Sequence, residues 1–423
     1  MPGLAPSALS RRQLTELLAE ARARTVLLAS SLSEEQLHAQ PDAAVQPVVR
    51  ELEQIVRFEQ RWLVHGSDTD HTGDDSSVAV PVETYDQWFD AMMEVRQGSL
   101  DRLEALHEHG IRSLLQYRCS LVLEHEYRRD EAILETLQLQ EQPPYRAPRR
   151  RTLPRGRRLA DPGIMVRFPG GTVPIGAAAF SPTWPDERPE HPVGLEPFWL
   201  DVMPVTNGDF LTFLAAGGYI TPDFWSEAGW EWVQSAGMQM PRHWLWEGGA
   251  WYTRWMDRAS PLEVACPAAN VSYYEAEAFA RFVGKRLPTE LEWEAAASWD
   301  PETQSRRNYP WGNMPPSPNV ANLDQLAFDT AAVGAYPGNV SAIGCYGLIG
   351  DLWEWTASDF VPYPGWGEAA STPPLSDQFG TDHKVLRGGS WATRPGAIRV
   401  TVRKPASPAA RHVFSGFRCA RDA

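Results

Sequence analysis

Apolar side chains recur at a helical period through residues 1–142. Ser10, followed three residues later by Gln13, has the pattern of a capping box, which marks the start of a helix. After this start, apolar residues recur at roughly helical spacing at Leu14, Leu17, Leu18, Ala21 and Val26. The same period predicts three more helices, at 47–65, 85–107 and 111–140. Four amphipathic helices with short or moderate connections predict an antiparallel bundle.

The helical pattern stops abruptly at EQPPYRAPRRRTLPRGRRLADPG (141–163), which combines Pro and Gly with seven Arg. Such a composition does not form a packed helix, so residues 143–166 are predicted to be a linker. The Arg run could grip an anion. It could equally be a solvated strap lying on acidic surface, which is the more common role of a charge run.

From 167 to 423 the chain is rich in Gly, Pro and Trp, and its apolar runs are short. Only two helices are predicted here, one at 206–216 and one that begins at Ser272. Short strands with many turn residues predict an α+β domain in which loops outweigh regular structure. The whole chain is therefore predicted to be α+β, a helical bundle followed by a loop-rich mixed domain.

Composition narrows the class of protein. Hydrophobic residues make up 43% and charged residues 22%, as in a globular protein, and 18 Trp residues favour a fold held by indole packing. The formal net charge of -15 argues against a nucleic-acid partner, because binding phosphates requires a basic face. No signal-peptide core and no apolar run of about 18 residues is present, so no membrane partner is expected. Four scattered cysteines indicate reduced thiols and a cytoplasmic protein.

The stretch LVLEHEYRRDE (121–131) carries the candidate chemistry of the bundle. Two imidazoles four residues apart on one helical face could bind a metal, but His125 is followed at that spacing by Arg129. A guanidinium has no free lone pair and stays protonated, so Arg129 cannot be a ligand.

Several phrases carry a family resemblance: PVTNGDFLTFL, GKRLPTELEWEAAA, YPWGN, GLIGDLWEWTASDF, VLRGGSW and GFRCARD. In this order they resemble the formylglycine-generating-enzyme (sulfatase-modifying factor) domain, a variant of the C-type lectin fold. The bundle resembles the DinB-like helical domain. The pairing of the two is the layout of the EgtB-type sulfoxide synthases of ergothioneine biosynthesis.

The resemblance implies a non-haem iron held by three bundle histidines, one on the second helix and two on the fourth. Here Gln54 stands at the first position, His125 at the second and Arg129 at the third, and Glu131 matches the acidic residue beyond. An Fe(II) site of His125, Gln54 and Glu131 is conceivable. Alternatively, His125 and Arg129 belong to a polar network in which Arg129 pairs with Glu124, Glu126 or Glu131.

The resemblance also implies substrate-binding residues near the terminal GFR phrase. Arg403 and Arg411 match the family there, whereas Lys404, Pro405 and Ala406 replace an Asn-Trp-Asp run. Arg129 and Trp355 are further substrate-binding candidates. The loop SDTDHTGDDSS (67–77) is too short to supply the family's contacts to its thiol substrate. The second substrate could therefore be a different thiol, a selenol or an amine acceptor, used together with an imidazole-type molecule.

Three further predictions concern the second domain. Tyr363 lies in the loop where the family keeps catalytic phenols, although it could equally be a packing residue. Asp351 and Glu354, spaced three apart, could bind a structural calcium. Three tryptophans of the matching phrases are predicted to be core, namely Trp353, Trp355 and Trp391.

Three functions remain open. The first is a diverged synthase that forms a carbon-sulfur or carbon-selenium bond oxidatively if a metal is retained. The second is a metal-free homologue that binds small molecules or a partner. The third uses His125 as a base against Glu126 or Glu131.

Overall fold

The structure of the chain is a computed structural model. It describes residues 9–65, 84–105, 113–148, 150–156, 163–178, 181–367 and 378–423. The described residues form two compact units, the first made of residues up to 143 together with 181–185, and the second of the other residues from 144 onward. The acidic loop predicted at 67–77 lies outside the described residues. The domain boundaries predicted at 142–143 and 166–167 stay predictions.

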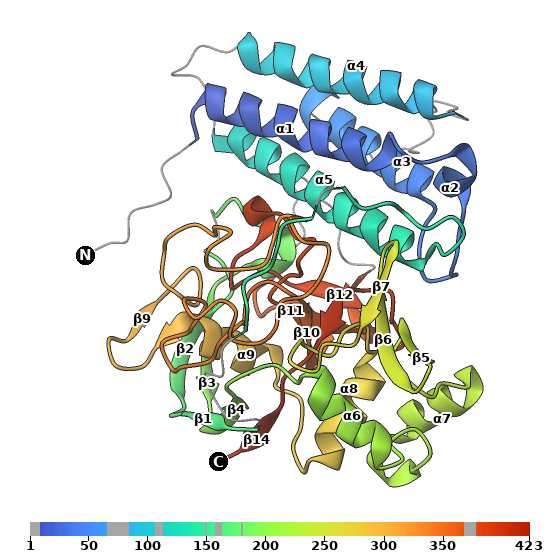
Figure 1. The fold of residues 1–423 in the computed structure, drawn as a ribbon. Helices are drawn as coiled ribbons and strands as arrows, with labels where there is room; N and C mark the ends of the chain where they lie inside the picture. Colours follow the sequence, from blue (N-terminus) through green and yellow to red (C-terminus); the bar gives the residue numbers. More distant parts are fainter. Residues whose placement is uncertain are drawn as a thin grey trace. The chain divides into compact units, whose positions relative to one another are not determined.

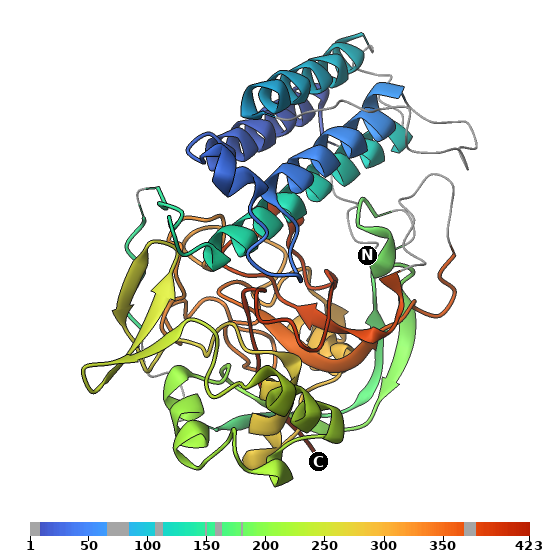
Figure 2. The same ribbon diagram turned by 90° about the vertical axis from the view of Figure 1, so that its right-hand side faces the viewer.

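The first unit is a bundle of four long helices (Figures 1 and 2). Its helical segments are α1 (Arg11–Ala29), α2 (Glu34–His38), α3 (Val48–Glu59), η1 (Gln60–His65), α4 (Tyr85–Glu104) and α5 (Ser113–Leu139). The predicted capping box is present, with the Ser10 and Gln13 side chains each bonded to the other's backbone N–H. The four predicted helices are confirmed, and α2 and the π-helical turn η1 were not predicted.

The helices of the bundle bury one another's apolar faces. α5 packs against α1 and α3, and α4 packs against α1 and α3. Most of the side chains of α5 between Leu121 and Leu139 are buried. The buried positions of this helix include Glu and Asp as well as Leu and Ile. Because buried charges require partners, these residues of α5 are expected to bind polar groups of the neighbouring helices.

The second unit has a four-stranded sheet at its centre, in the order β12-β11-β10-β13. Strands β10 (Trp353–Phe360) and β11 (Gly380–Arg387) are antiparallel, with Glu354 opposite Arg387 and Trp355 opposite Leu386. β12 (Lys404–Ala406) pairs with β11 antiparallel, and β13 (Ser415–Gly416) pairs with β10 parallel. This sheet carries the matching phrases that contain Trp353, Trp355 and Arg387.

Smaller sheets and short helices surround the central sheet. β1 (Met165–Phe168), β4 (Phe198–Asp201) and β14 (Ala420–Asp422) form one sheet, β2 (Gly171–Ile175) and β3 (His191–Leu195) a second. β5 (Trp244–Glu247), β6 (Ala250–Trp255) and β7 (Arg258–Pro261) form a third, and β8 (Trp299–Asp300) and β9 (Ser305–Arg306) a fourth. The helices are α6 (Asn207–Ala215), α7 (Glu227–Ala236), α8 (Tyr273–Phe282) and α9 (Glu290–Ser298), with 3-10 turns η4 (Pro185–Glu187), η5 (Pro222–Phe224) and η7 (Pro395–Ala397).

The predicted α+β class is confirmed, and two of its helices were missed. The helices predicted at 206–216 and from Ser272 are α6 and α8, whereas α7 and α9 were not predicted. The prediction that Trp353, Trp355 and Trp391 belong to the core is confirmed, since each is at most 4% exposed. All four cysteines are buried free thiols. Over the described residues, no helix has both the length and the apolar character needed to cross a membrane.

Two residues of the Arg-rich segment, Arg150 and Arg151, are bonded to other parts of the second unit. The Arg150 guanidinium donates to the backbone oxygens of Phe328 and Trp255, at 3.1 Å each, and to Asp257 Oδ1 at 2.9 Å. The backbone N–H of Arg151 donates to Leu326 O at 2.6 Å. The contacts of Arg150 fit the predicted strap along an acidic surface better than they fit a site that binds a free anion.

Candidate functional site

His125 lies on the buried face of α5 with its ring packed against an aromatic side chain of α3. Its imidazole is 7% exposed and stacks on Phe58, with ring centroids 3.9 Å apart and planes 3° apart. The Trp184 ring lies nearly parallel to it at 6.4 Å. Burial, followed by the positive charges of Arg129 and Arg128, lowers the pKa of His125 well below its usual value. His125 is therefore a neutral imidazole at neutral pH.

Arg129 is paired with a carboxylate from a different helix. Its Nη1 donates to Oε2 of Glu51 at 3.1 Å, and Glu51 is 4% exposed. The neighbouring carboxylates bind other arginines: Glu124 binds Arg128, and Glu126 binds Arg22 and Arg96. The predicted pairing of Arg129 with Glu124 or Glu126 is therefore wrong, and its partner is Glu51. Spacing within one helix gives no information about a partner on α3.

The residues at the expected ligand positions do not fit a three-histidine iron centre. One imidazole is present, and a guanidinium held by Glu51 stands at the third position, where a fixed positive charge repels a metal cation. Gln54 is half-buried on α3, and Glu131 is buried on α5. Within the ranges that the structure describes, no group of three or more His, Cys, Asp or Glu is placed to hold a metal ion. The reduced set of His125, Gln54 and Glu131 stays a prediction.

A buried cluster of four charges was missed by the sequence patterns. Glu59 accepts from Arg22 and Arg96 at 2.7 Å each, and Glu126 accepts from Arg22 at 2.8 Å and from Arg96 at 2.5 Å. All four side chains are at most 3% exposed. Burial alone would raise the pKa of Glu126, but the two arginines outweigh it and lower the pKa to about 2. Glu126 is thus a fixed carboxylate of the bundle, so the open reading that pairs it with a basic His125 is not favoured.

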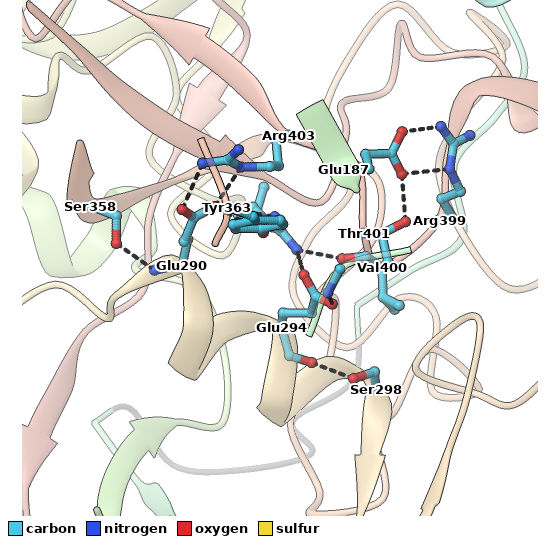
Figure 3. A network of polar contacts seen from close by, with 12 residues as sticks. Glu187, Glu290, Glu294, Ser298, Ser358, Tyr363, Arg399, Val400, Thr401 and Arg403 are labelled. Carbon is cyan, nitrogen blue, oxygen red and sulfur yellow. Dashed lines mark hydrogen bonds and ion pairs between the residues drawn. The ribbon is translucent and has the colours of Figure 1, made fainter. Parts of the chain in front are cut away.

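A second network of buried charges lies in the second unit and includes Tyr363 (Figure 3). The Tyr363 hydroxyl donates to Glu290 Oε2 at 3.4 Å and accepts from Arg387 Nη1 at 3.5 Å. The Arg403 guanidinium lies over the Tyr363 ring, 4.3 Å from its centroid. Burial and the charge of Glu290 raise the pKa of Tyr363. The phenol is therefore protonated at neutral pH, and its catalytic role stays a prediction.

Arg403 binds a carboxylate of the protein itself. Its Nε and Nη2 each donate to one oxygen of Glu290 at 2.8 Å (Figure 3). Its Nη1 donates to Asp186 O at 3.0 Å. The Arg403 side chain is fully buried. The bidentate geometry expected for a substrate carboxylate is used here for Glu290, which does not favour substrate binding by Arg403, and that role stays a prediction.

The other two substrate-binding candidates of this unit are held by internal contacts. Arg411 is 8% exposed, and its Nη2 donates to Glu275 Oε1 at 3.2 Å. Trp355 is fully buried, and its indole N–H donates to Val271 O at 2.8 Å. Trp355 is a core residue, which does not favour substrate binding, and that role stays a prediction. The role of Arg411 stays a prediction.

The two carboxylates proposed for calcium bind different donors of the protein. Glu354 accepts from Arg418 through both oxygens at 2.8 Å and from the Trp293 indole at 2.7 Å. Asp351 Oδ1 accepts from the Asn322 amide at 2.8 Å and from the Ala331 N–H at 2.7 Å. Protein donors occupy both oxygens of Glu354 and Oδ1 of Asp351, which does not favour calcium at this pair, and the calcium site stays a prediction.

Asp351→Asn is expected to stabilise the second unit at pH 8 and to have little effect near pH 4. Burial raises the pKa of Asp351 to about 6, above its usual 3.8. The native state therefore favours the neutral acid, and this contribution is present below pH 3.8 and lost as the pH rises through 6. An amide keeps the acceptor without the charge and suits the left-handed backbone at this position (φ 60°). The gain at pH 8 is expected to approach about 3 kcal/mol in urea denaturation.

The exposed Asp223 provides the control for this change. Asp223→Asn is expected to leave the denaturation midpoint unchanged at both pH values. A gain for Asp351→Asn that is equal at pH 4 and pH 8 would show that the charge of Asp351 is not the cause.

Known proteins match both parts of the chain. Residues 151–423 match the family described as the sulfatase-modifying factor enzyme 1-like domain. A hercynine oxygenase from Mycolicibacterium smegmatis is 36% identical, over 98% of this chain and 100% of the relative. Hercynine oxygenases from Mycobacterium tuberculosis and Mycolicibacterium thermoresistibile are 38% and 34% identical, over 98% and 97% of this chain and 99% and 95% of the relatives.

Proposed function

Because the chain belongs to the EgtB-type sulfoxide synthase family, we propose that it is a diverged synthase homologue that binds an imidazole-type small molecule together with a thiol or selenol. The observation that carries this substrate class is the end-to-end similarity to hercynine oxygenases, which covers the bundle as well as the C-terminal domain. A protein of this family in the ergothioneine pathway acts on small molecules. We also propose that the chain is located in the cytoplasm.

Oxidative carbon-sulfur or carbon-selenium bond formation is proposed for this chain only where a metal is retained. That reaction would take dioxygen as its oxidant, and an iron centre would supply the redox chemistry between dioxygen and the thiol or selenol. The Arg129–Glu51 pair favours the second candidate function, a metal-free homologue that binds the same molecules without joining them. In that case Tyr363, held between Glu290 and Arg387, acts as a packing residue.

Hercynine is expected to bind the full-length protein with a dissociation constant in the micromolar to millimolar range that is usual for substrates. Isothermal titration would measure this with hercynine alone, and then with cysteine or selenocysteine present. A joined, oxidised product formed after iron and dioxygen are supplied would support the synthase. Binding without product would support the metal-free homologue, and the absence of hercynine binding would contradict the proposed substrate class.

Tyr363→Phe is the matched variant for this experiment. Phenylalanine keeps the ring beneath the Arg403 guanidinium and removes only the hydroxyl. Hercynine binding is expected to be unchanged, and any product formation is expected to fall at least tenfold if the phenol takes part. Unchanged product formation would assign Tyr363 to packing alone.

A further inference from the structure

Three aromatic rings meet where the resemblance expects an iron site. Phe58 on α3 lies four residues after Gln54, and its ring is covered face to face by the His125 imidazole at 3.9 Å. Trp184, from the segment that joins the first unit, lies nearly parallel to Phe58 at 6.0 Å and to His125 at 6.4 Å. Trp184 and His125 are both at most 7% exposed. The imidazole is therefore packed as one ring of an aromatic group.

Two arginines of α5 complete this arrangement with charges. The Arg128 guanidinium lies 4.7 Å from the centroid of the Trp184 ring and also binds Glu124 one turn earlier. Arg129 binds Glu51, which lies on α3 three residues before Gln54. A cation over an indole and a partly buried ion pair both hold their side chains in place. The guanidinium groups of Arg128 and Arg129 therefore supply a positive charge at the place where the resemblance expects a metal cation.

We infer that this chain has converted the iron-ligand positions of its family into a packing seam, in which His125 and Arg129 join α5 to α3 and hold Trp184 on the bundle. The seam consists of Phe58, His125, Trp184, Arg128, and the Arg129–Glu51 pair. An aromatic ring at position 125 is required for stacking, whereas nitrogen donors at this position are not. The inference depends on the chain's family membership, and it does not depend on which small molecule the protein binds.

Replacing His125 by two different residues separates packing from metal binding. His125→Phe keeps a ring against Phe58 and removes both nitrogens, so the first thermal unfolding transition is expected within about 2 °C of the wild type. His125→Ala removes the ring and is expected to lower that transition by roughly 5–15 °C. Equal destabilisation by both changes would overturn the packing role.

Iron binding by the full-length protein provides the second readout. With Fe(II) added under anaerobic conditions and excess removed, wild type and His125→Phe are expected to hold the same small, substoichiometric amount of iron. Metal would be quantified by mass spectrometry. One iron per chain in the wild type, lost in both His125 variants, would overturn the seam and leave the proposed substrate class untouched.

Restoring nitrogen donors tests whether these are still the family's ligand positions. The double variant Gln54→His with Arg129→His offers imidazoles at all three positions, and is expected to bind one Fe(II) per chain, at least 100-fold more tightly than the wild type. The matched control is Gln54→His with Arg129→Met, which removes the same charge but adds one imidazole fewer. Equal iron binding by the two folded variants, or none by either, would contradict the assignment of Arg129 to a former ligand position.

Discussion

Arg96→Met is expected to lower the free energy of unfolding of the bundle by about 3–5 kcal/mol, the cost of leaving buried charges without a partner. Arg96 donates to both Glu59 and Glu126, and no side chain of the cluster is more than 3% exposed. Without the Arg96 side chain, Arg22 is the one cation of this cluster that pairs with the carboxylates of Glu59 and Glu126. Methionine fills much of the arginine's volume, so the loss reports charge more than packing.

Arg50→Met supplies the matched control on the same bundle. Arg50 pairs with Glu53 across one turn of α3, but its side chain is 61% exposed, and an exposed pair of this kind contributes little. Urea denaturation followed by circular dichroism would measure both variants. If Arg96→Met shifted the midpoint no more than Arg50→Met does, the buried cluster would not contribute to the stability of the bundle.

The bundle was more predictable from sequence than its polar interior. Apolar period and capping residues depend on neighbours within one helix, and they predicted four helices with ends close to those observed. Glu59 and Arg96 are charged residues on buried faces, and their pairing joins α3 to α4. A helical period contains no information about which charge on another helix will lie opposite, so the cluster could not be predicted.

α9 shows the same limit in the second unit. Its sequence ELEWEAAAS alternates glutamate with apolar residues, yet all three glutamates are buried. Glu290 binds Arg403, Glu292 binds Arg286 and caps the helix, and Glu294 binds Arg306. Because the buried face is as acidic as it is apolar, the pattern of an amphipathic helix is lost. Arg403 comes from far along the chain, so only the fold reveals what the buried Glu290 binds.

The candidate site in the bundle was predicted in one respect and missed in another. The absence of a donor at Arg129 follows from the chemistry of guanidinium alone. The partner Glu51 and the stack of His125 on Phe58 depend on how α3 packs against α5. A sequence therefore shows which ligand is lost, and the packing of two helices shows what replaced it.

Glu290→Gln is expected to destabilise the second unit by about 3–5 kcal/mol, because it leaves the fully buried Arg403 without a counter-charge. Glutamine keeps the shape of the side chain, but its amide nitrogen faces one of the two arginine donors that now bind Oε1 and Oε2. Arg387 also loses a contact to a carboxylate, since its Nη1 lies 3.4 Å from Glu290 Oε2. The change would be measured as the shift in the urea midpoint of the second unit.

The exposed Glu302 provides the matched control, since Glu302→Gln makes the same chemical change at the surface. It is expected to leave the midpoint unchanged. The double variant Glu290→Gln with Arg403→Met removes both charges at once and is expected to be more stable than Glu290→Gln alone, because no buried guanidinium is left unpaired. A double variant less stable than Glu290→Gln would mean that Arg403 stabilises the fold through its contacts with Asp186 O and the Tyr363 ring, independently of Glu290.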